Sequence, residues 1–103
     1  MMRKLVCRVS AVAPGENKGF LVPGIDVPVM VTNIGGTLYA TTSMCPHEEV
    51  SLLGGRVDGA RVVCPGHAYE FDVTTGRCPF DPELELFQYK TTIVDDLLYI
   101  ELA

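Results

Sequence analysis

Two cysteine–histidine pairs are the residues of this sequence best suited to chemistry. Cys45 and His47 flank a single proline, and Cys64 and His67 follow in the motif CPGH. These pairs contain both histidines of the chain and two of its four cysteines. Thiolate sulfur and imidazole nitrogen are ligands that zinc, copper and iron accept. We therefore predict that the two pairs together form one metal centre.

Each pair contains one cysteine and one histidine, and this mixture helps to distinguish a zinc site from a two-iron cluster. A structural zinc site usually groups cysteines about two to four residues apart and histidines about three to five apart. Here each pair mixes sulfur with nitrogen, and only Pro46 separates Cys45 from His47. Such close neighbours reach a single ion with difficulty, whereas they can reach two adjacent irons. A two-iron cluster is therefore our first interpretation, with a zinc site and Cys–His nucleophilic catalysis as the alternatives.

The motif C-P-H…C-P-G-H resembles the signature of Rieske iron–sulfur proteins. The similarity covers residues 45–89 and includes, beyond the four ligands, Leu52, Gly54, Gly55, Phe71, Pro82, Leu86 and Tyr89. The resemblance implies one [2Fe-2S] cluster, in which Cys45 and Cys64 bind one iron and His47 and His67 bind the other. It also implies that the proline-containing segment 79–82 covers the cluster from a third side.

Four positions differ from the Rieske proteins of respiratory complexes. Those proteins carry an extra, disulfide-bonded cysteine in each loop, and Val50 and Gly66 occupy these places here. They also carry a serine and a tyrosine whose hydroxyls bond to sulfur, where this chain has Tyr69 and Phe71. Because fewer donors to sulfur lower the reduction potential, the chain resembles the low-potential Rieske ferredoxins of bacterial multicomponent aromatic oxygenase systems.

This resemblance implies an electron carrier without catalytic residues of its own. Such a ferredoxin takes single electrons from a flavoprotein reductase and passes them to a terminal oxygenase, either a ring-hydroxylating dioxygenase or a related monooxygenase. The small Rieske-like subunit of a nitrite reductase and a standalone redox carrier are alternatives, and a zinc-binding interaction module is a remote one. The acidic residues Glu48, Glu49 and Glu70 are candidates to dock a basic partner.

Charge and hydropathy exclude other classes of protein. The 103 residues include 13 acidic and 8 basic side chains, a net charge of −5, which argues against binding to nucleic acid. We see no apolar run long enough to cross a bilayer, and the N-terminal residues alternate as a strand does and not as a signal peptide does. We therefore expect a soluble, cytoplasmic monomer that binds no membrane.

Alternating apolar and polar residues predict strands throughout the chain. The predicted strands cover residues 4–9, 19–22, 27–32, 37–41, 61–63, 68–73, 86–94 and 97–102. We predict one all-β Rieske domain over residues 1–103, an antiparallel barrel or sandwich. Its basal part covers about residues 1–41 and 84–103, and a small inserted β subdomain over about residues 42–83 binds the cluster. Cys7 is predicted to be a small buried apolar residue, and Cys78 is given no role.

Overall fold

The computed structural model describes residues 2–46, 50–65 and 69–102. Its elements are β1 (Met2–Arg8), the 3-10 helix η1 (Val9–Ala11), β2 (Asn17–Phe20), β3 (Val29–Ile34), β4 (Thr37–Thr42), β5 (Val57–Asp58), β6 (Arg61–Val63), β7 (Glu70–Asp72), β8 (Arg77–Cys78), β9 (Asp81–Glu85), β10 (Gln88–Val94) and β11 (Leu97–Leu102). In the described part of the chain, no helix has the length and apolar character that crossing a bilayer requires.

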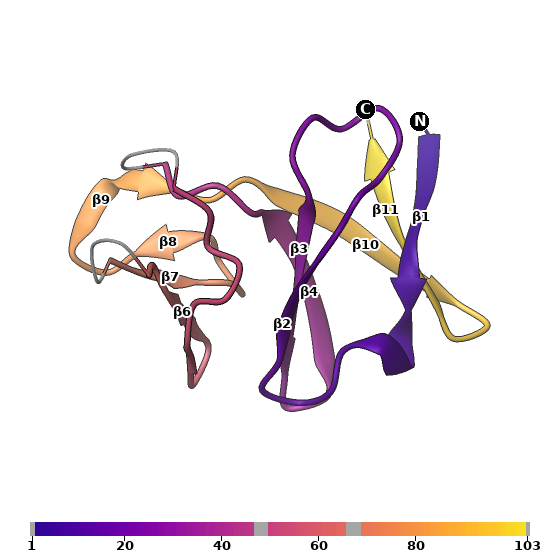
Figure 1. The fold of residues 1–103 in the computed structure, drawn as a ribbon, viewed down its shortest axis with the longest axis horizontal. Coiled ribbons are helices and arrows are strands. Elements are labelled where there is room, and N and C mark those ends of the chain that lie inside the picture. The colour runs from indigo at the N-terminus through magenta and orange to yellow at the C-terminus, as the bar shows by residue number, and fades with distance from the viewer. Residues whose placement is uncertain (1, 47–49, 66–68, 103) are drawn as a thin grey trace.

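The strands form three antiparallel sheets. A six-stranded sheet has the order β1-β11-β10-β4-β3-β2, and we call it the base sheet. Strands β5, β6 and β7 form a second sheet, and β8 pairs with β9. Figure 1 shows these two small sheets side by side at one end of the molecule, and we call residues 43–87, which contain them, the lobe. The prediction of an all-β antiparallel fold is confirmed.

Two tight turns explain the hairpins at the centre of the base sheet. Gly35 and Gly36 join β3 to β4 with φ of 60° and 97°, and Asp95 and Asp96 join β10 to β11 with φ of 51° and 63°. Positive φ at both central residues is the turn geometry that matches the twist of paired strands. Glycine adopts it freely, and aspartate tolerates it better than most residues do. The four strands of these two hairpins correspond to the predicted strands over residues 27–32, 37–41, 86–94 and 97–102.

The predicted strand over residues 86–94 is interrupted in the structure. Leu86 donates its backbone N–H to the carbonyl of Gly76 at 2.7 Å, and the carbonyl of Phe87 accepts a bond from Thr42 at 2.9 Å. Leu86 is thus bonded to the lobe, whereas the next residue, Phe87, is bonded to the base sheet. Strand β10 therefore begins only at Gln88, and β9 precedes it as a separate strand.

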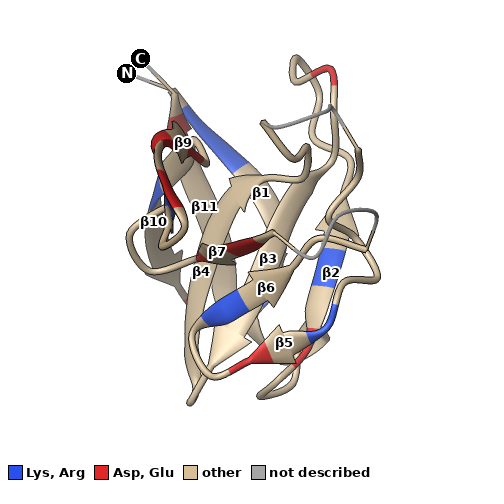
Figure 2. Cartoon of the chain, turned by 90° about the vertical axis from the view of Figure 1, so that its left-hand side faces the viewer, with Lys and Arg blue, Asp and Glu red and all other residues tan. Residues whose placement is uncertain are grey.

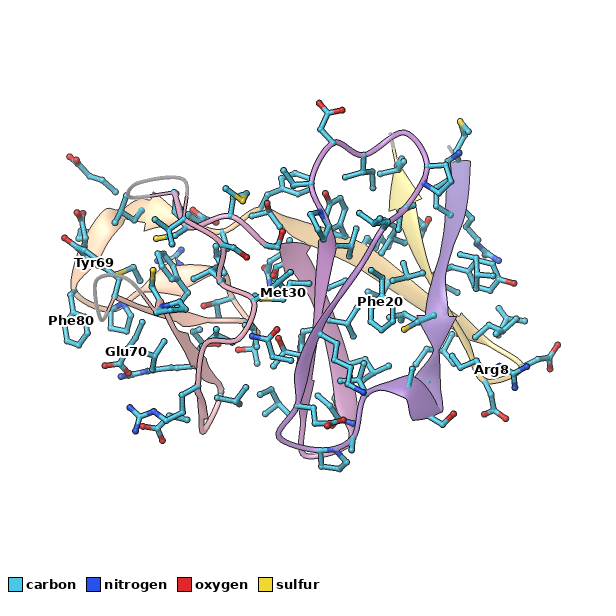
Figure 3. The ribbon with its side chains drawn as sticks, in the orientation of Figure 1. Arg8, Phe20, Met30, Tyr69, Glu70 and Phe80 are labelled. Atoms are coloured by element: carbon cyan, nitrogen blue, oxygen red, sulfur yellow. The ribbon has the colours of Figure 1, made fainter. Side chains whose placement is uncertain are left out.

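Buried side chains lie on both faces of β3, because successive residues of a strand point to opposite sides. On one face, Val29 and Val31 join the base core, which consists of Val12, Val22, Val29, Val31, Leu38, Ala40, Leu98 and Ile100. On the other face, Met30 joins the lobe core, which consists of Met30, Cys45, Leu52, Val62, Cys64, Phe71, Val73, Cys78 and Leu86. Figure 3 shows Met30 between the lobe and the base sheet. The same sheet thus supports both cores.

Candidate metal centre

The two predicted sulfur ligands begin loops that are closed in the same way. The backbone N–H of Cys45 donates to the carbonyl of Val50 at 2.7 Å, and that of Cys64 donates to the carbonyl of Tyr69, also at 2.7 Å. In each case the acceptor lies five residues after the cysteine. Because the two hydrogen bonds have the same length and span the same number of residues, the two cysteines occupy equivalent positions at the start of their loops. The predicted ligands His47 and His67 lie outside the described residues.

Short antiparallel pairings hold both loops in place. Before the first loop, Met44 forms a bridge with Ser51, and the N–H of Leu52 donates to the carbonyl of Ser43 at 2.7 Å. The second loop connects β6 to β7, whose register pairs Val62 with Phe71. The segment before each cysteine is therefore paired with the segment after its loop. Each loop thus connects the two halves of an antiparallel pair.

The thiols of the two loops lie in one apolar interior. Cys45 is 0% and Cys64 1% exposed, and both belong to the lobe core. The structure describes all four cysteines, and none of them forms a disulfide. Two enclosed thiols at equivalent positions, each followed in sequence by a histidine, are a sulfur and nitrogen donor set that suits a two-iron cluster.

Two of the positions that distinguish this chain from the respiratory type, Val50 and Phe71, are apolar in the structure. Phe71 lies in the lobe core at 0% exposure, so no hydroxyl is available there. Val50 packs against the lobe core and has no thiol that could bridge to the second loop. Tyr69 also packs against this core. The surroundings of Cys64 are therefore apolar at the position where the respiratory type has a tyrosine hydroxyl.

Acidic residues lie at the exposed end of the lobe. In Figure 2, the parts of β7 and β9 that are coloured red for acidic residues lie on the side that faces the viewer, together with the small sheets. Glu70 forms an ion pair with Arg61 at 3.4 Å, with 25% of the Glu70 side chain exposed. Such pairs are typically worth at most about 1 kcal/mol. Glu70 is thus partly neutralised, whereas the predicted docking residues Glu48 and Glu49 lie outside the described residues.

Cys78, for which no role was predicted, lies in the same core as the two predicted sulfur ligands. It is 3% exposed and belongs to the lobe core together with Cys45 and Cys64. Pro79 and Pro82 line one surface pocket with Cys78, beside the β8–β9 pair. A covering role for residues 79–82 stays a prediction.

Cys7 differs from the other cysteines and gives a first testable prediction. It is partly exposed on β1, whereas Cys45, Cys64 and Cys78 are buried. Burial raises the pKa of the Cys7 thiol above its usual value, so the reactive thiolate forms only in alkaline solution. We expect iodoacetamide to modify Cys7 alone, slowly at neutral pH and faster as the pH rises. Peptide mapping by mass spectrometry checks this, and equally fast labelling of Cys78 would contradict it.

Comparison with known proteins places this chain among iron–sulfur carriers. A biphenyl dioxygenase ferredoxin subunit from Pseudomonas sp. strain KKS102 is 38% identical over 80 residues, which are 77% of this chain and 72% of the relative. Ferredoxin CarAc from Metapseudomonas resinovorans is 37% identical over 77 residues, 75% of this chain and 71% of the relative. The naphthalene 1,2-dioxygenase ferredoxin component from Pseudomonas putida matches over 64% of its length, at 30% identity.

Solved structures agree with these relatives. A ferredoxin from Sphingomonas yanoikuyae B1 superimposes with a TM-score of 0.88 at 28% identity, covering 96% of this chain and 97% of the other. The structure of a complex of reduced oxygenase and oxidised ferredoxin in carbazole 1,9a-dioxygenase matches with a TM-score of 0.85 at 28% identity, covering 98% and 97%. A putative nitrite reductase small subunit is 18% identical, a likeness that shows the fold alone.

The family model described as Rieske [2Fe-2S] domain matches residues 2–90. This match covers both candidate loops and most of the base sheet. Together with two relatives above 35% identity, it establishes that the chain belongs to the Rieske [2Fe-2S] family and carries one [2Fe-2S] cluster.

Proposed function

We propose that this protein is an electron carrier that delivers single electrons to the terminal oxygenase of an aromatic dioxygenase system. The observation that carries the proposal is the pair of matched loops, each opened by an enclosed cysteine without a disulfide. Relatives that are 38% and 30% identical to this chain are named as ferredoxin parts of biphenyl and naphthalene dioxygenase systems. An electron carrier needs a redox group and a docking surface and no substrate pocket of its own.

The four cluster ligands that we propose are Cys45, His47, Cys64 and His67. The two cysteines hold their sulfur atoms inside the lobe core, where water does not reach them. A bound [2Fe-2S] cluster supplies a site that holds one electron at a time. Phe71 offers no hydroxyl to sulfur, which supports a potential in the lower part of the Rieske range.

We propose that the predicted cluster-binding subdomain, about residues 42–83, acts as a unit supported by the basal part, about residues 1–41 and 84–103. Several bonds link the segments at this boundary. The side-chain Nε2 of Gln88 donates to the carbonyl of Val73 at 2.9 Å, and Thr42 bonds to Phe87. The further proposals are a flavoprotein reductase as electron donor, a monomeric state and a cytoplasmic location, where thiols such as these four stay reduced.

Reconstitution with an oxygenase tests this function. The purified protein is expected to contain about two irons and two sulfides per chain and to take up one electron in a reductive titration. With NADH, a flavoprotein reductase and the oxygenase of a biphenyl or carbazole system, product formation should require the cluster-loaded protein and stop when apoprotein replaces it. A loaded protein that supplied a nitrite reductase and none of these oxygenases would overturn the proposal.

The oxygenase-docking surface that we propose lies at the exposed end of the lobe. Phe80 is 64% exposed there, and Figure 3 shows it at the same end as Tyr69 and Glu70. The next residues form β9, whose acidic side chains are Asp81, Glu83 and Glu85. Aromatic residues are frequent anchors of interfaces, and an acidic rim favours a basic partner. A ferredoxin 28% identical to this chain has been solved in complex with its oxygenase.

Replacing Phe80 by serine should therefore weaken electron transfer to the oxygenase. We expect the ferredoxin concentration at half-maximal turnover to rise about tenfold or more, as for the loss of an interface anchor. The visible spectrum and the reduction potential should not change, because Phe80 does not belong to the lobe core. The matched control is Leu21→Ser, which removes an exposed apolar side chain between β2 and β3, outside the lobe. Equal effects of both substitutions would refute docking through Phe80.

A further inference from the structure

The side of the base sheet that faces the lobe carries buried polar residues. Met30 points into the lobe core, so Thr32, two residues later on the same strand, faces the same side. Across the sheet, Thr41 is the partner of Met30 on β4, and Asn17 is the partner of Thr32 on β2. Thr32 and Thr41 are both 0% exposed. The lobe therefore rests on a partly polar surface, in contrast to the apolar base core on the other face.

Two oxygen atoms on this surface have no hydrogen-bond partner within the described part of the chain. They are Oγ1 of Thr32 and Oδ1 of Asn17, and both atoms are fully covered. The two residues are direct cross-strand partners, which places their Cβ atoms about 5 Å apart. Buried polar atoms in folded proteins are nearly always paired, with protein groups or with an ordered water. Another such oxygen among the described residues, Oγ of Ser43, lies one residue beyond the end of β4 and is not a cross-strand partner of either residue.

A segment of the lobe, residues 52–55, contacts β2 beside these two oxygens. The Nδ2 atom of Asn17 donates to the carbonyl of Leu52 at 3.5 Å, across the boundary between base sheet and lobe. Beside it, Leu53 lies directly on β2, since a Cβ atom at Gly19 would come within 2.5 Å of Leu53 Cδ1. The turn itself is closed by the bond from the N–H of Gly55 to the carbonyl of Leu52 at 3.0 Å. Asn17 therefore lies at the contact between the base sheet and a hydrogen-bonded turn of the lobe.

We propose that one internal water molecule binds between Asn17 and Thr32 under this turn. It donates a hydrogen bond to Asn17 Oδ1 and accepts one from the Thr32 hydroxyl, so that both unpaired oxygens are satisfied. The water also fixes which way the Asn17 amide faces, because its oxygen is held by the water and its nitrogen is left for Leu52. Asn17 then joins the base sheet to the segment that returns from the first cluster loop, where Leu52 bonds to Ser43.

The substitution Thr32→Val tests whether a water is bound. It should destabilise the protein if the site holds a water and stabilise the protein if the site is empty. Valine has nearly the shape of threonine and lacks the hydroxyl. If a water is bound, the substitution removes one of its partners, and we expect the unfolding equilibrium constant to rise about tenfold and the melting temperature to fall. If the site is dry, the substitution removes an unpaired polar group, and the protein becomes more stable. A raised melting temperature would therefore overturn the proposal.

A double-mutant cycle and a matched control complete the test. If Asn17 and Thr32 share one water, Asn17→Ala and Thr32→Val should be strongly non-additive, because either one alone disrupts it. The control is Thr41→Val on the same surface, since the Thr41 hydroxyl already donates to the carbonyl of Thr42 at 2.9 Å. We expect amide exchange at Gly55 to accelerate in Thr32→Val and not in Thr41→Val. Additive effects, or a high-resolution crystal structure without this water, would refute the site. None of these measurements depends on electron transfer.

Discussion

Replacing Cys64 by alanine is expected to leave a protein that cannot retain iron or acid-labile sulfide. The Cys64 thiol is 1% exposed, belongs to the lobe core and lies at the start of the second loop, where we propose that it binds iron. A [2Fe-2S] cluster of this family needs four protein ligands. Iron should therefore fall from about two per chain to almost none, and the brown colour and the EPR signal of the reduced protein should disappear. The same loss is expected for His47→Ala and His67→Ala.

Cys78→Ala is the matched control for this prediction. Cys78 is also buried in the lobe core, and its substitution removes the same sulfur atom from the same interior. Because we assign it no bond to iron, the variant should keep its iron content and visible spectrum and lose only about 1 kcal/mol of unfolding free energy. If Cys78→Ala lost its iron while Cys64→Ala kept it, the ligand set would be wrong, and Cys78 would be a ligand.

The parts of the fold that depend on neighbouring residues could be predicted from the sequence. Gly35-Gly36 and Asp95-Asp96 specify tight turns, and the alternating residues on either side of each turn specify strands. Similarly, the short spacing within each cysteine–histidine pair indicated two similar loops. The structure supports this with identical loop closures after Cys45 and Cys64. In each case the deciding interactions lie within a few residues of one another.

The parts that depend on distant residues could not be predicted in this way. The alternation of apolar and polar residues shows which face of a strand is buried. It does not show which other strand pairs with that strand. Thus the pairing of β1 with β11 joins the two ends of the chain and leaves no local signal. Strands as short as β5 and β8 show no periodicity at all. The sequence likewise could not distinguish Phe80, which is exposed, from Phe71, which is fully buried.

Gly55→Ala is expected to destabilise the lobe more than most single substitutions in this chain. A Cβ atom at Gly55 would overlap the carbonyl oxygen of Val63 and come within 2.9 Å of that of Leu52. Both are backbone atoms, so no side-chain rotation can relieve the contacts. We expect the unfolding free energy to fall by about 3 kcal/mol or more, as in severe overpacking of a core. Thermal or denaturant unfolding measures this loss.

The two carbonyls also connect Gly55 to the cluster loops. Val63 directly precedes Cys64, and Leu52 is hydrogen-bonded to Ser43, which lies just before the first loop. Displacing the Val63 carbonyl shifts β6, which precedes Cys64, and displacing the Leu52 carbonyl shifts the segment paired with Ser43 before Cys45. Both cysteines are proposed ligands. Gly55→Ala should therefore release iron at lower temperature than the original protein does, even under conditions in which the variant stays folded. Iron release during heating, followed by the visible spectrum, measures this second effect.

Gly54→Ala is the control for Gly55→Ala, although the φ angles alone would suggest that Gly54 is the more sensitive position. Gly54 has φ of +82°, in the region that favours glycine, but a Cβ atom there would meet nothing within 4 Å. Its substitution should cost only the backbone strain of a non-glycine residue, about 1 kcal/mol. Gly55 has an ordinary φ, so its requirement for glycine comes entirely from the close approach of two backbones. If Gly54→Ala were the more damaging of the two, the packing of residues 52–55 against β6 would have to differ from the one described here.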